Sequence, residues 1–262
     1  MRMNSNRNIP CEILVDDPDR PLAMLLLQGD MVFALGAAHS FQGMFADLLA
    51  GQVDTAASWP PASLVNALQK QHEREGQAGL FLNTVPVIAY EAAIQAGFEK
   101  HPLDKGSPPA YLYFFEGSPR FAELVQYTCR LAEGSELLKL MVQGISYDDG
   151  GYYTRMCLEN GPSFVCEVDR VPVCWSCTHL NGTMGMIYTP EEFRRKGYAR
   201  SLAAFQIDHM LGREGFACCH VVEGNSASES MVLGLGAKRD DTACCWRSII
   251  WPESRLAVIL SA

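Results

Sequence analysis

Residues 184–200 read MGMIYTPEEFRRKGYAR and contain the clearest structural signal in the chain. Its first five residues predict a short apolar strand, and from Tyr198 onward the pattern predicts an amphipathic helix. Between them stands a cluster of cations around Gly197, made of Arg194, Arg195, Lys196 and Arg200. Backbone N–H groups at the start of a helix attract anions, and glycine lets the backbone approach a phosphate closely. The stretch therefore predicts an anion-binding loop.

The composition indicates an ordinary globular protein with an acidic balance. The chain has 262 residues, 48% of them hydrophobic, with 30 acidic and 21 basic residues and a formal net charge of -9. This balance argues against a nucleic-acid partner, which needs broad basic surface rather than one patch. No early segment reads as a signal peptide, and the apolar run over 21–38 is interrupted and too short to span a bilayer. We expect a cytoplasmic protein without a membrane partner.

The ten cysteines fall on apolar runs rather than in loops. Six of them stand where strands are predicted: Cys166, Cys174, Cys218, Cys219, Cys244 and Cys245. Buried reduced thiols are typical of such positions in a cytosolic protein, so we expect few or no disulfides. Cys174 and Cys177 form a CxxC pair, but no second pair follows at zinc-ribbon spacing. The sequence therefore predicts no metal site.

Alternating strands and helices are predicted in the first half of the chain. Apolar patterning gives strands over 30–37, 79–83 and 111–115, and helices over 63–72, 86–96 and 118–133. Gly97 ends the second of these helices, and Ser118 with Pro119 is a good start for the third.

The second half of the chain gives a clearer succession of strands and helices than the first. Three antiparallel strands are predicted over 163–168, 171–178 and 183–188, followed by the helix after the basic loop, a very apolar strand over 216–222, a helix over 226–235 and a last strand over 243–251. This order indicates an α+β fold with a mixed sheet. We expect two domains, an N-terminal α/β domain over 1–130 and a C-terminal domain over 131–262, with the linker between 119 and 150.

The spacing of Arg194, Gly197 and Ala199 resembles the acyl-CoA-binding motif of the GNAT acyltransferase superfamily. The stretch RMCLENGPSFVCEVDRVPVCWSCTHLNGTMGMIYTPEEFRRKG over 155–197 looks more narrowly like the C-terminal domain of the glycine N-acyltransferase family. The matching positions are Pro172, Val173, Trp175, Ser176, Pro190, Glu192, Arg194, His220 and Asn225. The resemblance covers about 155–252. AYEAAIQAGFEK over 89–100 suggests a degenerate copy of the same fold in the N-terminal half.

This resemblance implies that acetyl-CoA or another acyl-CoA is the cosubstrate. Its pyrophosphate would lie on the N–H groups and cations of the basic loop, and its pantetheine arm would pair with the strand over 184–188 where that strand parts from the strand over 216–222. The expected CoA-binding residues are Met186, Ile187, Tyr188, Arg194, Arg195, Lys196, Gly197, Tyr198, Ala199, Asn225 and Ser228. An N–H near Met186 or Ile187 would polarise the thioester carbonyl.

The catalytic residues are less defined by the sequence. The family's expected base is a glutamate in a Gly-Glu-Met setting, but Thr183 stands in that place here. His220, with an ordinary pKa near 6.5, is one candidate, and Glu192 and Glu223 are others. Each also has a plain structural alternative: a satisfied core histidine, a carboxylate at a helix start and a loop carboxylate.

Other residues near these candidates also have two interpretations, a role in the reaction and a structural role. Val232 stands near the place where such folds often carry a tyrosine that protonates the thiolate, and Ser228 or Ser230 could hydrogen-bond the sulfur. Asn225 either pairs with pantetheine amides or caps the helix that follows it. Trp175 either fills the core or lines the acceptor site.

Taken together, these features predict an N-acyltransferase. An acetyl or other acyl group would move from acyl-CoA to a primary amine by direct attack in a ternary complex. The acceptor could be an amino acid, another small amine or a protein, and the oligomeric state stays open. Two other classes remain, a catalytically silent acyl-CoA sensor and a protein interaction module.

Overall fold

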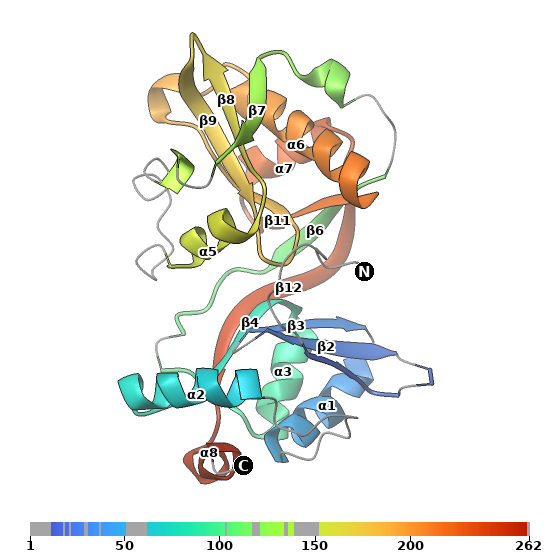
Figure 1. Cartoon of the computed structure of the whole chain (residues 1–262). Helices are drawn as coiled ribbons and strands as arrows, with labels where there is room; N and C mark the ends of the chain where they lie inside the picture. Colours follow the sequence, from blue (N-terminus) through green and yellow to red (C-terminus); the bar gives the residue numbers. More distant parts are fainter. Residues whose placement is uncertain are drawn as a thin grey trace. The chain divides into compact units, whose positions relative to one another are not determined.

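The computed structural model describes residues 12–17, 19–20, 22–28, 31–36, 38–50, 62–102, 104–116, 121–133, 136–138 and 152–260 (Figure 1). These residues fold as two compact units. Unit 1 is formed by residues of the range 111–241, and unit 2 by residues of 8–110 and 242–262. The division thus differs from the expected boundary at residue 130, because the N-terminal half contributes residues to unit 1 and the C-terminal half ends in unit 2.

Unit 1 contains a mixed sheet with helices. Its strands, in spatial order, are β6 (Ala110–Phe115), β11 (Ala217–Val222), β10 (Met184–Tyr188), β9 (Val171–Thr178), β8 (Ser163–Val168) and β7 (Thr128–Ala132). Its helices are α5 (Tyr152–Asn160), α6 (Tyr198–Glu214) and α7 (Ser226–Gly234), with short 3₁₀ turns η1 (Ala122–Leu124) and η2 (Glu191–Phe193). The strands β7 to β10 are antiparallel neighbours, whereas β10 and β11 run parallel.

Helix α6 packs its apolar stripe against this sheet. Its small and aliphatic residues Ala203, Ala204 and Ile207 are fully buried and share a core cluster with Met184 of β10 and Cys219 of β11. The helix ends at Gly215, whose φ of 75° places it in the left-handed region that glycine adopts without strain. Burial of this stripe holds the start of α6, and therefore the basic loop, against the edge between β10 and β11.

Unit 2 also contains a mixed sheet with helices. Its strands, in spatial order, are β1 (Glu12–Val15), β2 (Ala23–Gln28), β3 (Met31–Gly36), β4 (Gly79–Pro86) and β12 (Lys238–Ile250), and the short β5 (Glu99–Lys100) also pairs with β12. Its helices are α1 (Ala38–Ala50), α2 (Ala62–Glu75), α3 (Val87–Ala96) and α8 (Glu253–Leu260). The strands β1 to β3 are antiparallel, β3 and β4 are parallel, and β12 is antiparallel to β4.

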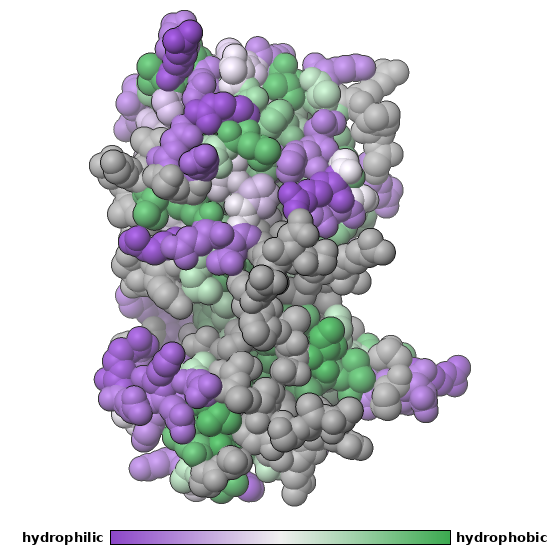
Figure 2. All heavy atoms as spheres, viewed as in Figure 1, coloured by the Kyte–Doolittle hydropathy of each residue, from purple (hydrophilic) through white to green (hydrophobic). Residues whose placement is uncertain are grey.

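Helix α2 illustrates how sequence pattern sets burial in unit 2. Leu64 and Leu68, four residues apart, are buried in the core, whereas Gln69, Lys70 and His72 are exposed. Figure 2 shows the corresponding hydrophilic side chains gathered where Figure 1 places α2. One stripe of the helix therefore contributes to the core and the other meets water.

The two units repeat one succession of elements. Three antiparallel strands lead into a helix, and the next strand returns parallel to the third: β1 to β3, α1 and β4 in unit 2, and β8 to β10, α6 and β11 in unit 1. The strand that follows each repeat is exchanged. β6, from the N-terminal half, lies beside β11, and most of β12, from the C-terminal half, belongs to unit 2 beside β4. This exchange explains why unit 2 combines residues from both ends of the chain and why unit 1 begins before the middle of the sequence.

Most predicted elements are confirmed, but the helix over 118–133 is wrong. In the described part of that range, η1 is followed by the strand β7, which pairs with β8 from Thr128 opposite Glu167 to Ala132 opposite Ser163. Ser118 and Pro119 lie outside the described residues. Arg130 of β7 forms ion pairs with Glu136 and Glu167. Pairing with a neighbour distant in sequence therefore overrides the local helical pattern.

The six cysteines expected on strands lie there, on β8, β9, β11 and β12. The nine described cysteines are free thiols, and Cys11 lies outside the described residues. In the ranges that the structure describes, no group of three or more His, Cys, Asp or Glu side chains is placed to hold a metal ion. No helix within those ranges combines the length and the hydropathy needed to cross a membrane.

Candidate functional site

Strand β10 is interrupted by a β-bulge. Gly185 lies opposite Cys177 of β9 and Tyr188 lies opposite Trp175, so Met186 and Ile187 together face a single residue of β9. Met186 has a φ of 52°, which is uncommon for a residue other than glycine. A bulge leaves one residue unpaired, and it therefore turns backbone polar groups of β10 away from the ladder. At these two residues the sequence analysis expects the N–H group that would polarise the thioester carbonyl.

The parallel strands β10 and β11 part almost at once. They pair at Met184 and Cys219, and none of the following residues of either strand is paired with the other. The closed end of the gap between them is thus at Met184, and its open end is at Tyr188 and the loop that follows. The edge of β10 in this gap offers its backbone to an extended ligand.

The basic loop stands at the open end of the gap. Gly197 is the N-cap of α6 with a φ of 87°, and no side chain caps the first turn. The cations Arg194, Arg195, Lys196 and Arg200 are all exposed. In the described chain Arg195 has no hydrogen-bond or ion-pair partner, whereas Arg194 donates from Nε to the carbonyl oxygen of Thr189 over 2.9 Å. The helix start therefore has open N–H groups, a favourable dipole and at least one unpaired cation.

The loop is held from the side by Tyr127, which the sequence analysis did not single out. Its hydroxyl donates to the carbonyl oxygen of Lys196 over 2.8 Å, and its ring centroid lies 4.5 Å from that of Tyr198. Ser201, in the first turn of α6, accepts hydrogen bonds at Oγ from the backbone N–H groups of Gln126 and Tyr127. The sequence did not predict this contact, because a helix was expected over 118–133 and the contact depends on the extended chain that leads into β7.

The structure gives the three candidate bases different surroundings. His220 lies on β11, one residue beyond the last pair with β10, and is half-buried. Burial, and then the charge of His179, lowers its pKa from 6.5 to about 4. His220 is therefore neutral at pH 7 but a weaker base than the ordinary value suggests. Glu192 in η2 and Glu223 after β11 are both exposed.

Thr183, which stands in the place of the family's glutamate, is buried, and its hydroxyl donates to Oδ1 of Asn181 over 2.8 Å. Asn225 is the N-cap of α7, where its Oδ1 accepts from the N–H of half-buried Ser228. Trp175 is 4% exposed, with its ring centroid 5.3 Å from that of Tyr188. Asn225 thus performs the capping role, with its amide N–H groups still exposed, and Trp175 fills the core.

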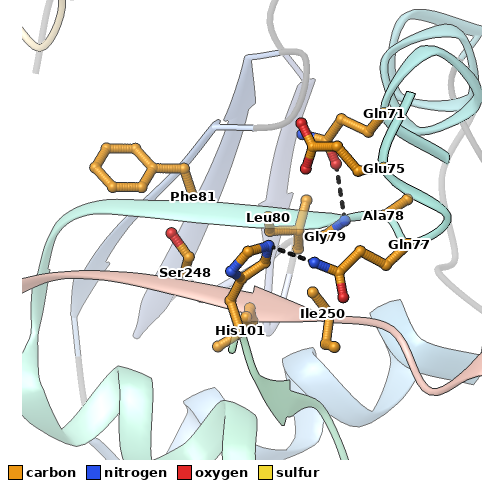
Figure 3. A pocket seen from close by; sticks show the side chains of 11 residues that line it. Gln71, Glu75, Gln77, Ala78, Gly79, Leu80, Phe81, His101, Ser248 and Ile250 are labelled. Atoms are coloured by element: carbon orange, nitrogen blue, oxygen red, sulfur yellow. Dashed lines mark hydrogen bonds between the residues drawn. The ribbon is translucent and has the colours of Figure 1, made fainter. Parts of the chain in front are cut away.

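A separate cavity of about 180 Å³ lies within unit 2 (Figure 3). Its polar groups are engaged with one another, since Nε2 of Gln77 lies 2.8 Å from Nε2 of His101 and Oε1 of Gln71 accepts from the N–H of Gly79. Pockets for small ligands usually measure about 300 Å³ or more. This cavity is therefore a poor candidate for the reaction site, and it contains none of the residues that the sequence singles out.

A family model described as FR47-like protein matches residues 170–247, a range that contains the bulge, the basic loop and α6. No curated protein matches the sequence.

Solved structures resemble the chain over most of its length. A Drosophila protein is 15% identical, with 87% of this chain and 74% of that chain covered and a TM-score of 0.56. A GCN5-related N-acetyltransferase from Kribbella flavida is 14% identical, covering 90% and 89%, with a TM-score of 0.46. A GCN5-related N-acetyltransferase-like protein from Streptococcus suis is 15% identical, covering 91% and 88%, with a TM-score of 0.47. At such identities, a likeness concerns the fold alone.

Proposed function

We propose that this chain, which has the mixed α+β fold of the GNAT acyltransferases, is an N-acyltransferase that moves an acetyl or other acyl group from acyl-CoA to a primary amine. One observation carries the proposal: the uncapped, basic start of α6 stands at the open end of the gap between β10 and β11. The basic helix start suits the pyrophosphate of CoA, and the strand edge beside it suits the pantetheine arm that ends in the thioester. The narrower assignment to a glycine N-acyltransferase rests on the sequence resemblance.

The pyrophosphate of CoA would bind at the basic loop. Its oxygens would accept hydrogen bonds from the N–H groups of residues 195–199, and the dipole of α6 would add to the attraction. Arg195, which is exposed and unpaired in the described chain, is the side chain best placed to add a cation, with Arg194 and Lys196 beside it. Tyr198 and Ala199 supply backbone from the first turn.

The pantetheine arm would extend along β10 from this loop. Amides of the arm can pair with the strand edge as an added strand would, through residues 186–188. Ser228 and the amide N–H groups of Asn225, at the start of α7, would also contact the arm. An N–H of Met186 or Ile187, freed by the bulge, would stabilise the negative charge that develops on the thioester oxygen.

The reaction would proceed by direct attack in a ternary complex. The amine nitrogen forms a bond to the thioester carbon, the C–S bond breaks, and CoA leaves as a thiolate. The amine must lose a proton, for which the sequence offers His220, Glu192 and Glu223. His220 is the nearest of these to the closed end of the gap, and its neutral ring suits a hydrogen bond with the entering amine.

Two measurements on the purified protein test this function. Calorimetry should show that acetyl-CoA binds, and a thiol assay should show that CoA is released when amines are present. The amine panel should include glycine and other amino acids, small polyamines and a lysine-containing peptide. Binding without release by any amine would favour the acyl-CoA sensor, for which Thr183 in the glutamate position argues. Absence of binding would reject both and favour an interaction module.

A further inference from the structure

The next inference rests on the proposed function and concerns where the acyl group reacts. The phosphate site is at the open end of the gap, so an arm that runs along β10 brings its thioester toward the closed end. There Gly185 and His220 are the first residues beyond the paired Met184 and Cys219. Groups that surround these two residues are therefore candidates for contact with the reacting atoms.

Gly185 and His220 lie on the face of the sheet away from α6. Met184 and Cys219 share a core cluster with residues of α6, and side chains alternate between the faces of a strand. Strand β9 shows the same two faces. Ser176 hydrogen-bonds Gln206 of α6, whereas its neighbour Cys177 interacts with Cys157 of α5. The face opposite α6 is thus the face of α5.

His179 occupies this face beside Gly185. A Cβ atom placed on Gly185 would overlap the imidazole of His179, with Nε2 as the nearest ring atom. The φ of Gly185 is not in the left-handed region, so glycine is needed here for space and not for backbone freedom. The absence of a side chain at 185 lets the ring of His179 lie directly on the strand that the acyl-CoA arm would follow.

Two residues of α5 hold this ring. Tyr153 and Cys157 are four residues apart, so they project from the same face of the helix. Nδ1 of His179 lies 3.2 Å from the hydroxyl oxygen of Tyr153. When Nδ1–H donates to that oxygen, Nε2 keeps its lone pair. The atom free to accept a proton is then the one nearest Gly185.

Cys157 of α5 and His220 of β11 are titratable groups beside His179. Hydrogen bonding by Cys177, and then by His179 and Tyr153, lowers the pKa of Cys157 to about 5 although burial raises it. His220 lies within electrostatic range on β11, and its own low pKa keeps it uncharged at neutral pH.

We propose that His179 is the general base of this site and that Tyr153 is its positioning residue. As the amine attacks the thioester carbon and CoA leaves as a thiolate, the proton of the amine nitrogen passes to Nε2 of His179. His220, the neutral histidine on the neighbouring strand, then serves as a hydrogen-bonding partner for the amine. Together they supply the function for which the chain lacks a glutamate at position 183.

The test compares His179→Gln with His209→Gln in the full chain. Loss of a general base typically lowers turnover by about a hundredfold or more. We expect that loss for His179→Gln in the thiol-release assay, with acetyl-CoA affinity by calorimetry unchanged. His209 is a matched control, because it is a half-buried histidine of α6 that contacts Phe164. Its replacement should leave turnover within about twofold, a range set by the small effects usual for substitutions outside a site.

Two further variants separate chemistry from folding. His179→Ala should regain part of its turnover when imidazole is added to the assay, which a purely structural role would not permit. Tyr153→Phe should move the acid limb of the pH–rate profile to lower pH, because the imidazolium loses a hydrogen-bond acceptor.

A wild-type rate in His179→Gln, or the absence of imidazole rescue in a folded His179→Ala, overturns the assignment of His179 and leaves the acyltransferase function standing. If the wild-type protein binds acetyl-CoA but releases no CoA with any amine, the function and this assignment both fail.

Discussion

At the scale of single residues, Gly197 combines a conformational demand with a chemical one. Its φ of 87° favours glycine, yet a Cβ there would meet nothing closer than 3.8 Å, at the ring of Tyr127. Aspartate tolerates this backbone conformation better than most residues. A carboxylate at this position would therefore occupy the phosphate space without forcing the protein to unfold.

We expect Gly197→Asp to abolish acetyl-CoA binding in calorimetry while circular dichroism remains that of the wild type. Gly212→Asp is the matched control, because it adds the same charge to α6 at an exposed position with nothing within 4 Å of its Cβ. Unchanged affinity in a folded Gly197→Asp protein would remove the basic loop from the proposed site.

His220 leads to a prediction about stability and pH. Its pKa in the folded protein is about 4, below the ordinary 6.5, because of burial and the charge of His179. Between these values the unfolded chain binds the proton more readily, so the free energy of unfolding should fall as the pH is lowered from 6.5 to 4. The shift corresponds to about 3 kcal/mol at most.

Urea denaturation at several pH values should show this decline in the wild type and a clearly smaller decline in His220→Gln. The half-buried His209, whose pKa is also lowered by burial, contributes to what remains. An equal slope in both proteins would mean that His220 is not held neutral by its surroundings.

At the scale of elements, the approach to β7 supports the basic loop through one hydroxyl. Tyr127→Phe removes the hydrogen bond to Lys196 and keeps the ring against Tyr198. A hydrogen bond of this kind contributes about 1 kcal/mol, so the Kd for acetyl-CoA should rise about fivefold. Tyr111→Phe, which removes a hydroxyl from β6 in the same unit, should leave the Kd unchanged. Calorimetry on the two variants decides whether the contact preorganises the loop.

The strands and helices next to the basic loop were predictable because local chemistry determines them. Alternating and apolar runs marked β8 and β9, and glycines marked the ends of α3 and α6. The strand β7 was not predictable, since its extended form depends on pairing with β8. Helix α5 was also missed, although its residues from Arg155 onward fall within the stretch used for the family resemblance.

The same distinction applies to the site. The cations and Gly197 are contiguous in sequence, so their convergence at one helix start could be inferred directly. The group around His179 is contributed by α5, β9 and β10, and only the fold brings these elements together. The one local signal was Gly185 within an apolar strand, which indicates the close approach of another group.

At the scale of the whole molecule, the exchanged strands determine which pieces of the chain can fold. A fragment over 131–262 lacks β6 and all but the last two residues of β7, so β11 and β8 each lose the pairing of a neighbouring strand. We expect this fragment to be unfolded by circular dichroism and unable to bind acetyl-CoA. A fragment over 111–241 retains both strands and should bind. Equal binding by the two fragments would show that β6 and β7 are dispensable for the site.

The exchange of β6 and β12 also limits which parts of the gene can be lost. Residues 34–43 of unit 2, at the junction that corresponds to the basic loop, read ALGAAHSFQG and carry no lysine or arginine. That copy of the fold therefore lacks a counterpart of the cations that precede α6. A deletion that removes this copy must still spare the codons for β6, which follow its N-terminal part directly. A gene shortened to its C-terminal half would lose a strand beside β11, so the point at which the chain can be shortened is set by β6 and not by the midpoint of the sequence.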